Sequence, residues 1–83
     1  MQLTLLVRAY CHLCDDMRAA LAPIAQRANA RVVELDVDAD PALEAAYGAL
    51  VPVLLLGSVE DGRELCHYHI DAQLVTDALA GAR

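Results

Sequence analysis

The first thirty residues change from a short apolar run to a helical repeat of apolar positions. Residues 2 to 8 are apolar on both faces of a strand, which predicts a central position covered from both sides. Residues 13 to 29 then repeat apolar side chains every three or four positions, as one buried face of a helix requires. The apolar positions of this helix are Leu13, Met17, Ala20, Leu21, Ile24 and Ala28. Pro23 lies inside it, and because the repeat continues beyond it we expect a kink rather than an end.

Residues 31 to 37 alternate between apolar and charged side chains. The pattern predicts an edge strand with one exposed, charged face, and Val33, Leu35 and Val37 would share the other face. A strand, a helix and a second strand in this order form a βαβ unit. We therefore expect the first two strands to be parallel and joined by a right-handed crossover.

The next segment carries the end signals of a short helix. Asp40 stands before Pro41, a pair typical of a helix N-terminus, because the carboxylate accepts from free backbone N–H groups and proline suits the first turn. Gly48 is typical of a helix end. We therefore expect a short helix that begins at Pro41 and ends at Gly48.

A hairpin and a last helix follow. Residues 53 to 56 are entirely apolar and predict a second central strand. Turn residues over 57 to 62 predict a hairpin, which would place a shorter, more polar strand over 63 to 68 at the opposite edge. Asp71 is a suitable N-cap for a final helix ending near Gly81. The side chains expected to be buried on this helix are Leu74, Val75, Ala78, Leu79 and Ala82.

Length and composition predict a single domain spanning residues 1–83 with an aliphatic core. Hydrophobic residues make up 58% of the chain, without Trp or Phe, so the core must consist of many small aliphatic contacts. The net charge of −6 opposes contact with phosphate backbones and excludes a nucleic-acid function. No apolar stretch approaches the ~18 residues of a membrane span, and no basic leader precedes the first strand. We therefore expect a cytoplasmic protein without membrane contact, and we expect it to be a monomer.

Two of the three cysteines lie where the first strand gives way to the first helix. Cys11 and Cys14 are three positions apart, and a thiol just before a helix faces unpaired backbone N–H groups and the positive end of the helix dipole. Both features favour the thiolate. In a reducing compartment such a pair is typical of redox catalysis or metal binding rather than of a structural crosslink. An inactive pair stays open as a third interpretation.

A metal site needs further ligands, and Cys66 and His69 could supply them. With Cys11 and Cys14 they form a formal Cys₃His zinc set. However, the expected strands place Cys66 two strands from Cys11, about 10 Å at the usual strand spacing, whereas zinc–sulfur bonds are about 2.3 Å long. We therefore expect Cys66 to be a small apolar residue of the edge strand, and zinc binding remains an alternative.

The order of elements, the Cys-x-x-Cys pair after the first strand and the Val51-Pro52 step before the third strand resemble the thioredoxin fold. The absence of an extra N-terminal strand and the position of Arg8 ahead of the cysteine pair resemble its glutaredoxin branch. The segments Cys11 to Met17, Asp36 to Asp38 and Val51 to Leu54 are similar to short bacterial glutaredoxin-like proteins. This resemblance implies an α/β fold of order β-α-β-α-β-β-α. The sheet would be four-stranded and mixed, with the third strand antiparallel to the first and helices on both faces.

The same resemblance implies a chemistry. Cys11 would be the attacking thiol and Cys14 the resolving one. The Val51–Pro52 bond would be cis and lie against the disulfide, and Val51 would offer its backbone N–H and C=O to an extended thiol substrate such as glutathione or a peptide. The residues expected to contact the substrate are Arg8, Tyr10, His12, Leu13, Val51, Pro52 and Asp71.

One segment departs from the glutaredoxin pattern. Glutaredoxins usually carry two glycines and then an acidic residue after the fourth strand, whereas this chain has His67, Tyr68 and His69 before Ile70 and Asp71. Asp71 corresponds to the acidic residue. The three rings replace the small residues that let glutathione approach, so we expect them to obstruct a standard glutathione pocket.

The charged groups near Cys11 have opposite effects on the stability of its thiolate. The helix dipole, Arg8 and a protonated His12 favour the thiolate of the first cysteine. Asp15 and Asp16, in the first turn of the helix, disfavour it. We therefore expect only a modest activation of the thiol, and a protein that is reducing rather than strongly oxidising.

Together these features predict a glutaredoxin-like thiol–disulfide oxidoreductase that takes part in electron transport without a bound cofactor. Its partner would be a disulfide-containing protein or a low-molecular-weight thiol, with glutathione as a candidate co-substrate. Two alternatives remain open. One is a non-enzymatic thioredoxin-fold module that binds a partner through the same face, and the other is the zinc protein built on Cys11, Cys14, Cys66 and His69.

Overall fold

The computed structural model describes residues 1–82 and shows an α/β fold. Its elements in chain order are β1 (Gln2–Val7), α1 (His12–Ala28), β2 (Arg31–Asp36), the 3₁₀ turn η1 (Val37–Ala39), α2 (Pro41–Tyr47), β3 (Val53–Leu56), β4 (Arg63–His67) and α3 (Ala72–Gly81). The predicted order of helices and strands is confirmed, with η1 as an addition. Helix α1 continues through Pro23 as one element.

The four strands form one mixed sheet in the order β2-β1-β3-β4. Strand β1 is parallel to β2 and antiparallel to β3, and β3 is antiparallel to β4. The two strands that were predicted to be central, β1 and β3, are therefore the central pair. The pairing between β3 and β4 is irregular at Leu54 and Leu55, where the β4 strand carries an extra residue.

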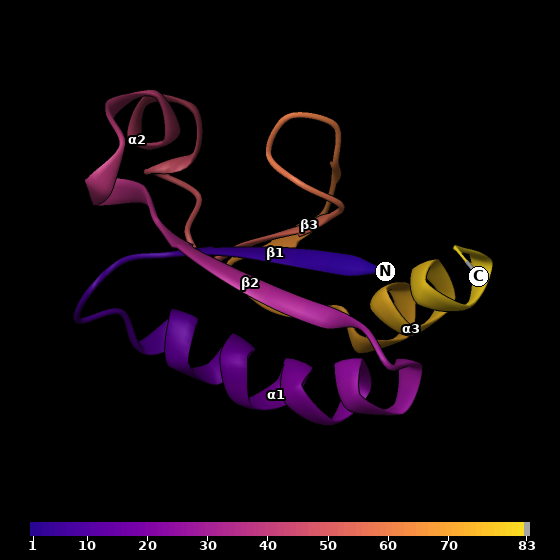
Figure 1. Ribbon diagram of the computed structural model, residues 1–83. Helices are drawn as coiled ribbons and strands as arrows, with labels where there is room; N and C mark the ends of the chain where they lie inside the picture. The colour runs from indigo at the N-terminus through magenta and orange to yellow at the C-terminus, as the bar shows by residue number, and fades with distance from the viewer. Residues whose placement is uncertain (83) are drawn as a thin grey trace.

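Helices cover both faces of the sheet (Figure 1), with α1 and α3 on one face and α2 on the other. Adjacent residues of a strand point to opposite faces. Leu5 and Leu54 accordingly belong to the core cluster beneath α1 and α3, whereas Leu6 and Val53 belong to the cluster beneath α2. This two-sided burial explains why the central strands have no polar face.

The chain leaves the edge strand one residue earlier than expected. Val37 was predicted to continue the alternation of β2, but β2 ends at Asp36 and Val37 begins η1. The Asp36 side chain accepts a hydrogen bond from the N–H of Asp38, which turns the backbone. Val37 is fully buried there, in the cluster beneath α2.

The last helix buries a narrower face than its apolar pattern predicts. Val75 and Leu79 are buried, but Leu74 is 40% exposed and Ala82 is exposed as well. The prediction that Leu74 and Ala82 are buried is therefore wrong. Helix α3 packs against α1 and β4 with Val75 and Leu79 as its buried residues, so a narrow apolar stripe covers the contact.

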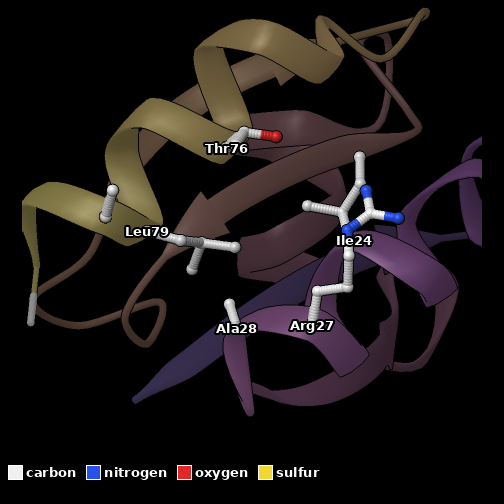
Figure 2. A pocket seen from close by; sticks show the side chains of 6 residues that line it. Ile24, Arg27, Ala28, Thr76 and Leu79 are labelled. Carbon is white, nitrogen blue, oxygen red and sulfur yellow. The ribbon is translucent and has the colours of Figure 1, made fainter.

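A shallow hollow of about 230 Å³ lies between α1 and α3. It is lined by Ile24, Arg27 and Ala28 of α1 and by Thr76, Leu79 and Ala80 of α3 (Figure 2). The three α1 positions belong to the C-terminal half of that helix, away from its N-terminus. Among residues 1–82, no helix is both long enough and apolar enough to cross a membrane.

Candidate active site

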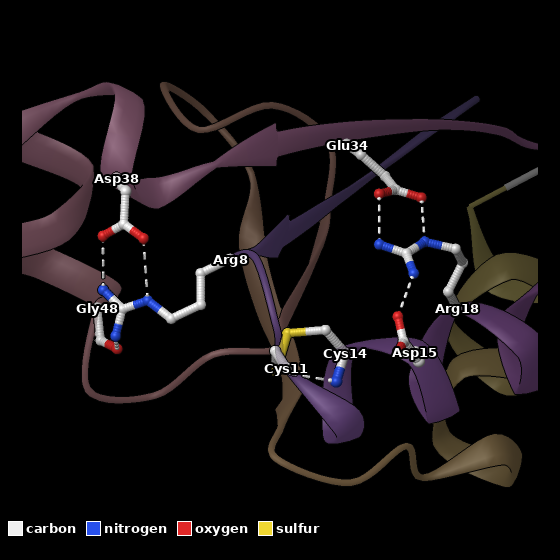
Figure 3. The surroundings of a disulfide bond; sticks show 8 residues. All are labelled: Arg8, Cys11, Cys14, Asp15, Arg18, Glu34, Asp38 and Gly48. Carbon is white, nitrogen blue, oxygen red and sulfur yellow. Dashed lines mark hydrogen bonds and ion pairs between the residues drawn. A yellow bond between two sulfur atoms is a disulfide. The ribbon is translucent and has the colours of Figure 1, made fainter.

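The chemically distinctive feature is a disulfide between Cys11 and Cys14 at the N-terminus of α1 (Figure 3). Cys11 is the N-cap residue, with an extended backbone, and its Sγ accepts a hydrogen bond of 3.1 Å from the N–H of Cys14. The two Cα atoms are 5.2 Å apart. The capping position for the first sulfur, predicted from the junction of strand and helix, is confirmed.

The two sulfurs differ in access. Cys11 is only partly buried, whereas Cys14 lies one turn inside the helix and is 1% exposed. Thiol exchange requires a thiolate that an incoming disulfide can reach. In the reduced protein, Cys11 would combine this access with the stabilisation that an N-cap position gives to a negative charge. Cys14 could react only with a group already attached to Cys11.

Arg18 neutralises one of the two carboxylates in the first turn of the helix. It donates to Asp15 at 2.8 Å and forms a bidentate pair with Glu34 of β2, with the shorter contact at 2.7 Å (Figure 3). The hydrogen bonds that Arg18 donates to the carboxylates of Glu34 and Asp15 raise its pKa, so it stays positively charged. The repulsion that Asp15 exerts on a Cys11 thiolate is thereby weakened.

Arg8 is tied into the fold. Its guanidinium binds both carboxylate oxygens of Asp38, at 2.8 and 3.3 Å, and donates to the carbonyl oxygen of Gly48 at 3.2 Å (Figure 3). Glu44 is 3.8 Å away. The hydrogen bond to Asp38 raises the pKa of Arg8. Arg8 therefore links the end of β1 to η1 and to the end of α2, and its charge is shared with two acids before any substrate arrives.

The segment that leads into β3 contains a cis peptide bond between Val51 and Pro52, as the resemblance implies. The side chains of Val51 and Cys11 both pack against the core cluster beneath α1 and α3. Within residues 1–82, neither the N–H nor the C=O of Val51 forms a hydrogen bond. Two unused peptide groups are therefore present in the segment that leads into β3.

The remaining predicted contact residues occupy different environments. Tyr10 has a φ of 58° and is fully exposed, and His12 is exposed as well. Leu13 is half-buried and Pro52 is buried. Asp71 caps α3, because its carboxylate accepts a 3.1 Å hydrogen bond from the N–H of Leu74.

Tyr68 forms two hydrogen bonds to the segment before β3 that the sequence did not predict. Its N–H donates to the carbonyl oxygen of Pro52 and its phenol oxygen donates to the carbonyl oxygen of Ala49, both at 2.9 Å. The sequence marked Tyr68 only as a departure from a glycine pattern. No local signal could have revealed these contacts, because Ala49 precedes Tyr68 by 19 positions.

The third cysteine is separate from the disulfide. Cys66 lies in β4 opposite Leu54, is partly buried and is a free thiol. Among residues 1–82, no group of three or more His, Cys, Asp or Glu side chains is placed to hold a metal ion. The formal Cys₃His set therefore does not fit a zinc ion in this arrangement.

We expect the Cys66 thiol to react slowly in the folded protein. Burial raises its pKa, a hydrogen bond from the backbone N–H of Asp71 lowers it in part, and the Asp71 and Glu64 carboxylates raise it again. Less thiolate is then present at a given pH, so alkylation of the oxidised protein should begin to rise at a higher pH than in the same chain unfolded in urea. Alkylation followed by mass spectrometry over pH 7 to 10 measures this. Equal rates in the two states would contradict the burial of Cys66.

The sequence of this chain matches a known protein family and a mycobacterial relative. The family model of the Glutaredoxin-like domain (DUF836) matches residues 2–80. An uncharacterized protein of Mycobacterium tuberculosis is 33% identical over 75 residues, covering 84% of this chain and 73% of that protein.

Several solved structures are similar to this chain in fold and in sequence. A protein of X. campestris is 43% identical, with a TM-score of 0.72 and coverage of 98% of this chain and 99% of that one. A Nitrosomonas europaea protein solved by NMR is 30% identical, with a TM-score of 0.79 and coverage of 93% and 88%. A mutant thioredoxin of Halobacterium salinarum is 26% identical, with a TM-score of 0.73 and coverage of 96% and 72%.

Proposed function

Because the chain belongs to the family of glutaredoxin-like domains, we propose that it is a thiol–disulfide oxidoreductase in which Cys11 attacks and Cys14 resolves. The observation that carries this proposal is the asymmetry of the pair. The N-capping sulfur is accessible, and its partner is buried one turn further along the helix. A disulfide with only a structural role would not need one exposed, thiolate-stabilising position.

The reaction runs in two exchange steps. The Cys11 thiolate attacks one sulfur of the substrate disulfide, forming a mixed disulfide and releasing the first substrate thiolate. The Cys14 thiolate then attacks the Cys11 sulfur, and the second substrate thiolate leaves. Two electrons pass to the substrate and the Cys11–Cys14 disulfide forms, which is the form seen in the structure. An external dithiol reductant, as found in the cytoplasm, would restore the two thiols.

Two features near Cys11 support substrate binding. The unused N–H and C=O of Val51 can pair with an extended backbone segment on either side of a reacting cysteine, as in strand addition to a sheet edge. Tyr10 and His12 lie exposed beside the reacting sulfur and could contact the same segment. No cofactor enters this scheme, since the substrate and the two cysteines hold all the electrons that move.

The reduction potential of the Cys11–Cys14 pair tests the proposal. We expect a value near that of thioredoxin, about −270 mV, rather than the oxidising value of about −120 mV. The protein is equilibrated in glutathione and dithiothreitol redox buffers, quenched with acid and analysed by mass spectrometry after alkylation. A potential well below about −300 mV, typical of structural disulfides, would show that the pair does not cycle and would overturn the assignment.

A further inference from the structure

Tyr68 spans the segment that carries the unused peptide groups of Val51. Its backbone N–H is bonded to Pro52 and its phenol oxygen to Ala49, so the ring runs alongside the residues between them. The ring is 41% exposed, and the His67 ring contacts it edge-to-face, with the centroids 4.8 Å apart. Tyr68 is therefore a part of the surface that a substrate meets next to Val51.

The backbone at Tyr68 is unusual for a large side chain. Its φ of 63° lies in the left-handed region, which glycine adopts freely and other residues adopt only at a cost in backbone strain. Such a conformation persists only where surrounding contacts fix it. Here the two hydrogen bonds to Ala49 and Pro52 supply those contacts. A glycine would fit the backbone better but would leave the segment uncovered.

The same segment is also fixed at its beginning. Arg8 donates to the carbonyl oxygen of Gly48, and Tyr68 donates to the next carbonyl oxygen, that of Ala49. The peptide groups of Val51 are thus held in place before a substrate binds. A fixed, extended edge favours a ligand that pairs through its own backbone, because less conformational entropy is lost on binding.

The charges around this edge disfavour a small anionic thiol. Glutathione carries two carboxylates and one ammonium group, and binding it normally requires cations or free N–H groups. Arg8 and Arg18, the arginines on either side of the cysteine pair in the sequence, already form ion pairs. Asp16 and Asp71 are exposed, and the chain carries a net charge of −6. A polypeptide segment lacks these terminal charges.

From these observations we infer that Tyr68 determines the substrate class of the site. It holds the Val51 edge for an extended polypeptide disulfide and covers the adjacent surface against glutathione mixed disulfides. This inference rests on the proposed exchange function and adds to it the kind of disulfide that is used. Tyr68 contacts substrate through its ring, and it positions Val51 through its two hydrogen bonds.

A pair of substrates and one substitution test the inference. The kcat/KM of the reduced protein is measured with a peptide that contains an internal disulfide and with the mixed disulfide of glutathione and mercaptoethanol. In Tyr68→Gly, whose backbone suits a positive φ, we expect the ratio of peptide to glutathione kcat/KM to fall about 10-fold or more. The ratio is informative because a general loss of stability would lower both values together.

Asn29→Gly is the matched control. Asn29 also has a positive φ, 54°, but it caps the far end of α1, so its substitution relieves the same backbone cost without touching the site. We expect its substrate ratio to equal that of the wild type. Tyr68→Asn, another residue that tolerates the left-handed region, replaces Tyr68→Gly should that variant fail to fold.

The outcomes separate the two proposals. A wild type that reduces the peptide disulfide, combined with an unchanged ratio in the Tyr68 variants, overturns the role of Tyr68 and leaves the exchange function standing. A wild type that already prefers the glutathione substrate also overturns it. If the wild-type protein reduces neither disulfide, both the exchange function and the role of Tyr68 are overturned. A fall in the ratio that is absent from Asn29→Gly supports the inference.

Discussion

Cys11→Ser should reduce disulfide exchange by at least about 10³-fold, on the scale seen when a catalytic nucleophile is removed. A serine hydroxyl cannot form the mixed disulfide, and the buried Cys14, 1% exposed, cannot reach an external substrate in its place. The measurement is the reduction of a peptide disulfide by the dithiol form of each variant, with the peptide thiols titrated over time.

Cys14→Ser should behave differently and so identifies the order of attack. The first exchange step remains open to Cys11, but no thiol is left to resolve it, so a covalent adduct with the substrate should accumulate and be visible by mass spectrometry. Cys66→Ala is the control, because Cys66 lies in β4 as a separate free thiol. It should keep the wild-type rate.

Two results would contradict this scheme. Exchange retained in Cys11→Ser would mean that another thiol is the nucleophile. Loss of exchange in Cys66→Ala, in a protein that is still folded, would show that the third cysteine takes part. A protein that binds a partner equally well with and without Cys11 and exchanges no disulfide would instead be a binding module.

Leu79→Ala should be the more damaging of two matched substitutions on α3. Leu79 is 1% exposed and belongs to the main core cluster, so truncation should lower the free energy of unfolding by about 2–5 kcal/mol. Leu74→Ala changes the same residue type on the same helix, but Leu74 is 40% exposed. Its effect should stay within about 0.5 kcal/mol.

Urea unfolding followed by circular dichroism measures both values. The urea concentration at the midpoint should fall clearly for Leu79→Ala. The slope of the unfolding free energy against urea concentration should stay the same in both variants. Similar losses in the two variants would mean that α3 packs through a wider face than the structure shows. The comparison therefore tests how wide a face of α3 is buried.

Much of the fold follows from local pattern. The apolar strands at residues 2 to 8 and 53 to 56 predicted the central pair of the sheet, because only strands covered on both faces lack a polar side. The starts of α2 and α3 could also be predicted from neighbouring residues. Asp40 and Asp71 cap these helices through side-chain oxygens that accept hydrogen bonds from nearby N–H groups. The position of Cys11 as the N-cap of α1 belongs to the same class of local prediction.

Contacts between distant segments were not predictable in this way. The sequence did not predict that Arg8 pairs with Asp38, 30 positions later. The burial of Leu74 was predicted from helical spacing, yet spacing alone cannot say how wide a face the neighbouring elements will cover. Both depend on how helices and strands pack, and the apolar pattern of a single element carries no information about that.

The sequence by itself determined the elements, their order, the central strands and the placement of two thiols at a helix N-terminus. Each of these depends on side chains within one or two turns of one another. The helical position of the two cysteines also predicted Cys14 as the less exposed one. Only the tertiary structure decided that Cys14 is almost completely buried, 1% exposed, and that the peptide groups of Val51 have no hydrogen-bond partner within residues 1–82. It also decided that Tyr68 bonds to Ala49 across 19 positions. These features arise where separate segments meet, because burial and hydrogen bonding there depend on the partner that packing supplies.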